Sequence, residues 1–160
     1  MTHDKAVRLL AACRGRDLTI ATAESCTGGL IAAEITAVPG ASDVFERGFV
    51  TYSNLAKVEM LGVDPATLEE FGAVSEPVAA QMASGALAKS GAGLCLAVTG
   101  VAGPGGTFAK PEGMVCFGLA LGPKLITETV QFGAIGRAAV RDATVQHAID
   151  MALSLIDGNL

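Results

Sequence analysis

Apolar residues follow two patterns along the chain, one with the spacing of a helix and one with the short continuous runs of a buried strand. Helical spacing, with proline or glycine at the ends of elements, predicts helices over residues 4–14, 30–38, 54–61, 75–89 and 135–156, and a further helical turn at Asp64-Pro65. Apolar runs predict strands over residues 18–21, 44–52, 94–98, 114–121 and 125–131.

The order of these elements predicts the fold class. Helices alternate with strands in the first part of the chain, which favours parallel strands, whereas the last two strands flank Gly122-Pro123 as a hairpin. We therefore expect a three-layer α/β/α domain with a mixed, mostly parallel sheet and a late antiparallel hairpin. The length of 160 residues, without repeats or linkers, predicts a single domain over residues 1–160.

Composition narrows the function classes. Apolar residues make up 51% of the chain and charged residues 17%, as expected for a globular protein with a large buried core. No apolar run approaches the ~20 residues that span a bilayer, and the N-terminus lacks a signal-peptide pattern, so we expect a cytoplasmic protein without membrane contact. A net charge of −5 argues against broad nucleic-acid binding.

Cysteine and histidine usage bears on metals and disulfides. Cys13, Cys26, Cys95 and Cys116 are far apart and form no Cys-x-x-Cys pair, which is typical of small buried side chains in a reducing compartment. With two histidines in the whole chain, no metal site is expected.

Residues 22–29, Thr-Ala-Glu-Ser-Cys-Thr-Gly-Gly, form the predicted turn between the first strand and the following helix. Ser25 would lie just before a helix N-terminus, whose unpaired N–H groups favour a developing oxyanion. In the alternative interpretation, Ser25 or Thr27 simply caps the helix. Cys26 is a rival nucleophile, or a small thiol that faces the core.

A serine nucleophile needs a base, and Lys57 is the best candidate. His3 lies in a terminus and His147 in the last helix, and no Gly-x-Ser-x-Gly elbow surrounds Ser25. If Asn54 is the helix N-cap, Lys57 is the third helical residue, where the helix dipole and partial burial both favour the neutral amine. Tyr52 could relay or stabilise the proton. Alternatively, Lys57 is a solvated surface lysine and Tyr52 only packs.

Two further segments are candidates for substrate binding. A loop with four glycines, residues 100–106, follows a predicted strand and could let backbone approach a substrate, with Thr99 at its mouth. The loop fits neither a dinucleotide motif nor a P-loop. Arg137, or Arg141 one turn later, could bind phosphate, although each could be a surface cation. Lys110 and Glu112 are expected to be solvated.

Three motifs together resemble the CinA C-terminal domain family. They are Thr22-Ala-Glu-Ser-Cys-Thr-Gly-Gly29, Tyr52-Ser-Asn-x-x-Lys57 and Ala97-Val-Thr-Gly-Val-Ala-Gly-Pro-Gly-Gly106, and they occur in order over nearly the whole chain. Shorter matches are Val38-Pro-Gly40, Gly72-Ala-Val-Ser-Glu76 and Lys110-Pro-Glu-Gly113. The resemblance implies hydrolysis of nicotinamide mononucleotide to nicotinate mononucleotide and ammonia, without a metal or organic cofactor.

The resemblance also implies roles for particular residues. Ser25 matches the nucleophile, and Lys57 and Tyr52 match its activating partners. The expected substrate-binding residues are Thr27, Gly28, Asn54, Thr99, Gly100, Gly103, Gly105 and Arg137. The family further suggests a homo-oligomer, and this chain corresponds to a stand-alone form. The alternatives are a non-catalytic nucleotide-binding module, an amidase for another small amide, and an accessory role in competence or DNA damage.

Overall fold

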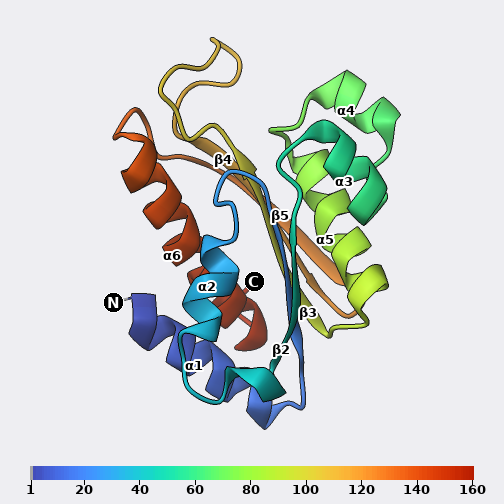
Figure 1. The fold of residues 1–160 in the computed structure, drawn as a ribbon, viewed down its shortest axis with the longest axis vertical. Coiled ribbons are helices and arrows are strands. Elements are labelled where there is room, and N and C mark those ends of the chain that lie inside the picture. The colour runs from blue at the N-terminus through green and yellow to red at the C-terminus, as the bar shows by residue number, and fades with distance from the viewer. Residues whose placement is uncertain (1) are drawn as a thin grey trace.

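In the computed structural model, which describes residues 2–160, five strands form one mixed sheet with helices on both faces (Figure 1). The order across the sheet is β2-β1-β3-β4-β5. The strands are β1 (Ile20–Glu24), β2 (Phe45–Val50), β3 (Leu94–Gly100), β4 (Met114–Leu121) and β5 (Lys124–Gln131). β1 pairs in parallel with β2 and β3, while β4 is antiparallel to β3 and β5, so four of these five strands point the same way. This confirms the predicted fold class.

The helices divide between the two faces according to the path of the chain (Figure 1). α1 (Thr2–Gly15), α2 (Leu30–Thr36) and α6 (Arg137–Ile156) pack together, and α3 (Asn54–Leu61), α4 (Pro65–Phe71) and α5 (Glu76–Ser90) pack on the other face. A short 3₁₀ helix, Ala41–Asp43, precedes β2. The chain moves from β1 to β2 on one side of the sheet and then back past β1 to β3. Because such crossovers are right-handed, this reversal places their helices on opposite faces.

Side-chain size along the central strands sets how closely each helical layer approaches. On β3, Leu94, Leu96 and Val98 contribute to the core under α1, α2 and α6. Cys95 and Ala97 alternate with them and join the core under α3–α5. The smaller residues let α5 lie close to the sheet, and a Cβ on Gly118 of β4 would overlap the carbonyl oxygen of Ala79. No helix within residues 2–160 is both long and apolar enough to cross a bilayer.

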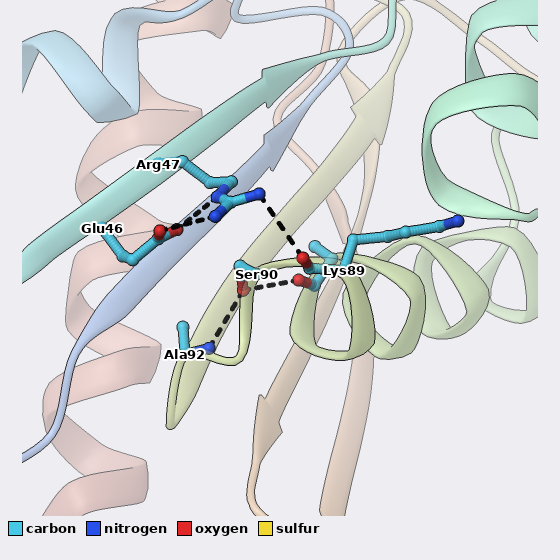
Figure 2. A network of polar contacts seen from close by, with 6 residues as sticks. Glu46, Arg47, Lys89, Ser90 and Ala92 are labelled. Carbon is cyan, nitrogen blue, oxygen red and sulfur yellow. Dashed lines mark hydrogen bonds and ion pairs between the residues drawn. The ribbon is translucent and has the colours of Figure 1, made fainter.

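A polar network connects the edge strand β2 with the end of α5 (Figure 2). Arg47 pairs with Glu46 and donates a hydrogen bond to the carbonyl of Lys89, 3.4 Å away. Ser90 donates to the carbonyl of Ala86 in the helix and accepts from the N–H of Ala92, which closes the helix end before β3. The Glu46–Arg47 pair is solvent-exposed, so its net contribution to stability is small.

Candidate active site

The three parallel strands end at one edge of the sheet and bring the predicted motifs together. Glu24, the last residue of β1, is in register with Val50 on β2 and with Val98 on β3. Ser25 and Thr51 therefore leave the sheet side by side, and the N–H of Ser25 donates to the carbonyl of Val98. The chain order reverses between β1 and β3, the place where open α/β sheets bind ligands.

Lys57 reaches Ser25 from the first turns of α3. Its Nζ lies 3.0 Å from Ser25 Oγ, 2.9 Å from the carbonyl oxygen of Thr51 and 3.2 Å from that of Tyr52. Lys57 is 1% exposed and takes part in none of the ion pairs found within residues 2–160. The structure thus places the candidate base against the candidate nucleophile and contradicts the alternative of a solvated lysine.

The surroundings of Lys57 favour its neutral form. Burial lowers the pKa of Lys57 from its ordinary value, and the charge of a Cys26 thiolate would oppose this shift. A neutral amine has two N–H bonds and one lone pair. If the carbonyls of Thr51 and Tyr52 accept the two N–H bonds, the lone pair is left to face the hydroxyl of Ser25. In that protonation state the arrangement would suit a base that takes the serine proton.

The cap of α3 differs from the prediction. Ser53, in an extended conformation, is the N-cap, and its hydroxyl accepts the N–H of Ala56 at 3.0 Å. Asn54 is instead the first helical residue and is exposed, so Lys57 is the fourth. Serine and asparagine are about equally good caps, and residue preference alone could not separate two adjacent candidates.

Glu24 is a site residue that the sequence analysis missed. Its carboxylate is buried and accepts hydrogen bonds from the Thr27 hydroxyl (2.6 Å) and from the N–H groups of Ile31 (2.8 Å) and Ala32 (3.0 Å). The first-turn N–H groups of α2 are therefore occupied, and the expected anion site for Ser25 at that helix start is wrong. An acidic residue just before the candidate serine was the available signal, because carboxylates stabilise helix starts.

The side chain of Tyr52 points to a different partner from the one expected. Tyr52 is 60% exposed, and its hydroxyl accepts a hydrogen bond from Arg137 at 3.1 Å. Its backbone carbonyl is the group that contacts both Lys57 and Ser25, the latter at 3.4 Å. The predicted proton relay through the Tyr52 phenol is therefore wrong, and Tyr52 contacts Ser25 and Lys57 through its backbone carbonyl instead.

The two arginines at the start of α6 have separate roles. Arg137 donates to the carbonyl of Gly103 at 2.6 Å and joins the glycine-rich loop to Tyr52. Arg141 donates to the carbonyls of Cys26 and Thr27, both at 3.1 Å, and so braces the turn that carries Ser25. Gly28 lies beside Arg141 and closes the same turn with an N–H bond to the carbonyl of Ser25.

Other predicted binding residues are held by contacts within the protein. The hydroxyl of Thr27 is committed to Glu24, and that of Thr99, which is buried, donates to the carbonyl of Ala73 at 2.9 Å. A Cβ on Gly100 would lie 2.7 Å from a methyl group of Val115, so this glycine permits packing on β4.

The segment that follows the glycine-rich loop packs back against it. Gly103 has φ +91° and faces the Glu112 side chain, whereas a Cβ on Gly105 would meet open space. Lys110 is not solvated as expected, because its Nζ donates to the carbonyl of Phe71 at the end of α4 (3.1 Å) and to that of Val74 before α5. The loop is thus tied to both helical layers, through Lys110 on one side and Arg137 on the other.

The remaining candidates have structural positions. Cys26 is buried in the core, and burial raises the pKa of its thiol to about 11, which disfavours a thiolate nucleophile. His147 packs against Phe117 and pairs with Glu128 at 3.0 Å, on β4 and β5. A cavity of about 500 Å³ opens between the end of α5 and the β4–β5 turn, and Ser25 and Lys57 are not among the residues that line it.

The fold and this geometry define an α/β domain with a buried serine–lysine pair at the carboxyl ends of its parallel strands. The model of the CinA C-terminal domain family matches residues 2–156. The chain belongs to this family.

Curated relatives are longer than this chain. It is 61% identical over 106 residues to a CinA-like protein of Chlorobaculum tepidum, covering 66% of this chain and 25% of that protein. It is 49% identical over 156 residues to a CinA-like protein of Mycobacterium marinum, covering 94% and 35%. The chain therefore spans between a quarter and about a third of the length of these relatives.

Solved structures share the fold over almost the whole chain. The crystal structure of a competence/damage inducible protein from Agrobacterium tumefaciens matches with a TM-score of 0.94 and 46% identity, covering 96% of this chain and 94% of the other. A CinA-superfamily protein from Klebsiella pneumoniae matches with a TM-score of 0.95 and 32% identity, covering 99% of each.

Proposed function

We propose that this domain hydrolyses the carboxamide of nicotinamide mononucleotide to nicotinate mononucleotide and ammonia, with Ser25 as nucleophile and Lys57 as base. The observation that carries the proposal is the 3.0 Å contact between Lys57 Nζ and Ser25 Oγ, with two backbone carbonyls placed to accept both hydrogens of the neutral amine. The motif resemblance that includes both residues supplies the substrate.

Each step can be assigned to a group of the chain. Lys57 takes the hydroxyl proton as Ser25 Oγ adds to the carboxamide carbon. The resulting oxyanion is stabilised by the N–H groups of Cys26 and Thr27, which donate to no backbone carbonyl within residues 2–160. Lys57 then returns the proton to the departing nitrogen, which leaves as ammonia. Water attacks the acyl-enzyme in the same way and releases the acid.

Arg137 is the better of the two arginines for the substrate phosphate. Its side chain is exposed beside the Tyr52 hydroxyl and the glycine-rich loop, whereas Arg141 is turned toward the carbonyls under the nucleophile. A guanidinium retains further N–H donors after two hydrogen bonds, and phosphate is a preferred acceptor. Gly105, with open space around it, lets the loop backbone approach the nucleotide.

The test is ammonia release from nicotinamide mononucleotide, nicotinamide riboside and nicotinamide. We expect turnover of the mononucleotide, with kcat/KM at least roughly tenfold above that of the riboside, because a charge-assisted hydrogen bond to phosphate contributes about 1.5–3 kcal/mol. Release from another small amide alone would favour a different amidase. Binding of the nucleotide without ammonia would favour a non-catalytic module.

A further inference from the structure

We propose that the Ser25–Lys57 pair also hydrolyses small uncharged esters, with short-chain aryl esters as the substrate class. The inference rests on the serine–lysine chemistry of the proposed function, but it does not require a nucleotide. It therefore assigns a second activity to the same nucleophile.

The structural basis is that the site has two separable parts. The reactive part consists of Ser25, Lys57 and the carbonyls of Thr51 and Tyr52, all held by buried strand ends and the first turns of α3. The outer part consists of Arg137, the Tyr52 hydroxyl and the carbonyl of Gly103. The contacts that aim Lys57 at Ser25 are made by backbone and exist without a substrate, so the pair needs no phosphate to assemble it.

Leaving-group chemistry explains why esters should react. An amide nitrogen must gain a proton before it can depart, and Lys57 must deliver that proton at the right moment. A phenolate departs with its electron pair and needs no proton, so the acylation step requires Lys57 only to accept the proton of Ser25. Ser25 is 8% exposed, so an ester of the small acetyl group is the appropriate probe.

The reaction balances without any group from outside except water. Ser25 Oγ bonds to the ester carbonyl carbon, its proton moves to Lys57 Nζ, and the carbon–oxygen bond to the aryl group breaks to release phenolate. Lys57 loses this proton to solvent. Water then adds to the acetyl-serine, Lys57 accepts its proton and passes it to Ser25 Oγ, and acetic acid leaves.

The experiment follows phenolate release from para-nitrophenyl acetate by the wild type, Ser25→Ala and Ser84→Ala. Ser84 lies exposed on α5 and is a matched serine control. We expect the wild type and Ser84→Ala to exceed the rate of the Ser25→Ala protein at least tenfold, with one acetyl group on the Ser25 peptide by mass spectrometry after rapid quenching. Equal rates for wild type and Ser25→Ala, with matching circular dichroism, would overturn the inference.

A competition experiment separates this inference from the proposed function. Nicotinamide mononucleotide should inhibit ester hydrolysis competitively, because both substrates need Ser25. Ester hydrolysis that depends on Ser25 but is insensitive to the nucleotide would support the ester activity and contradict the nucleotide substrate. Ammonia release that depends on Ser25, without ester hydrolysis, would support the nucleotide substrate and contradict the ester activity.

Discussion

Burying a lysine is costly, and Lys57 is tolerated because its amine has three polar partners. Three oxygen atoms lie within 3.2 Å of Nζ, from Ser25, Thr51 and Tyr52. None of them is a carboxylate, so no negative charge among these partners offsets the burial that lowers the pKa of Lys57. The same burial that disfavours the charged amine therefore supports the proposed role of Lys57 as a base.

The pH dependence follows from the direction of this shift. We expect kcat/KM to rise with pH and to level off above the pKa of Lys57, with a midpoint below the ordinary lysine value of 10.5. The measurement is a pH–rate profile with nicotinamide mononucleotide, with circular dichroism at each pH to show that the protein stays folded. A profile that is flat over the whole range below 10.5 would argue against Lys57 as the base.

The hydrogen bonds of the Glu24 carboxylate predict that this residue contributes to the stability of the fold. In Glu24→Gln, an amide NH₂ replaces one acceptor oxygen and faces backbone N–H or hydroxyl donors, so a buried donor is left unsatisfied. We expect the free energy of unfolding to fall by about 1–3 kcal/mol in urea denaturation. The exposed Glu59→Gln on α3 should change it by less than about 0.5 kcal/mol. Equal stability of the two variants would refute the capping role.

Among the elements, α5 determines how the α3–α5 layer meets the rest of the molecule. A Cβ on Gly85 of α5 would overlap the backbone carbonyl of Leu61 at the end of α3. Because α3 carries Lys57, close packing of these two helices fixes the distance of the base from the sheet edge. A glycine inside a helix, costly by propensity, is explained by this approach.

We expect Gly85→Ala to destabilise the protein by about 1–3 kcal/mol, since overpacking a rigid backbone contact forces the helices apart. Gly15→Ala at the end of α1 is the matched control, because its Cβ would meet nothing within 4 Å and its φ is not in the left-handed region. Thermal unfolding of both variants makes the comparison. A Gly85→Ala protein as stable as Gly15→Ala would contradict the close contact.

Elements were more predictable from sequence than the contacts between them. Proline and glycine at element ends located α3 and both hairpin strands to within a residue, whereas α2 ended two residues before the expected boundary. The contact between Ser25 and Lys57 could be predicted, because motifs that follow parallel strands meet at one edge of the sheet. The capping role of Glu24 and the orientation of the Tyr52 side chain could not be predicted. Both depend on tertiary contacts, which leave no periodic pattern in the sequence.

At the scale of the whole molecule, the candidate site depends on three strand ends and two helical layers. β1 supplies Ser25, the segment after β2 supplies the carbonyls that hold Lys57, and α6 supplies Arg137. Because β1, β2 and β3 are parallel, their carboxyl ends bring these segments to one edge of the sheet. Assembly into a homo-oligomer stays a prediction.

Ammonia release from nicotinamide mononucleotide by Ser25→Ala, beside wild type and Ser84→Ala, tests the central claim most directly. We predict that Ser25→Ala loses at least about a thousandfold in kcat, as expected for removal of a nucleophile, while Ser84→Ala retains wild-type turnover. Circular dichroism should show that both variants are folded. Ammonia release by folded Ser25→Ala at a rate close to that of the wild type would contradict the serine mechanism.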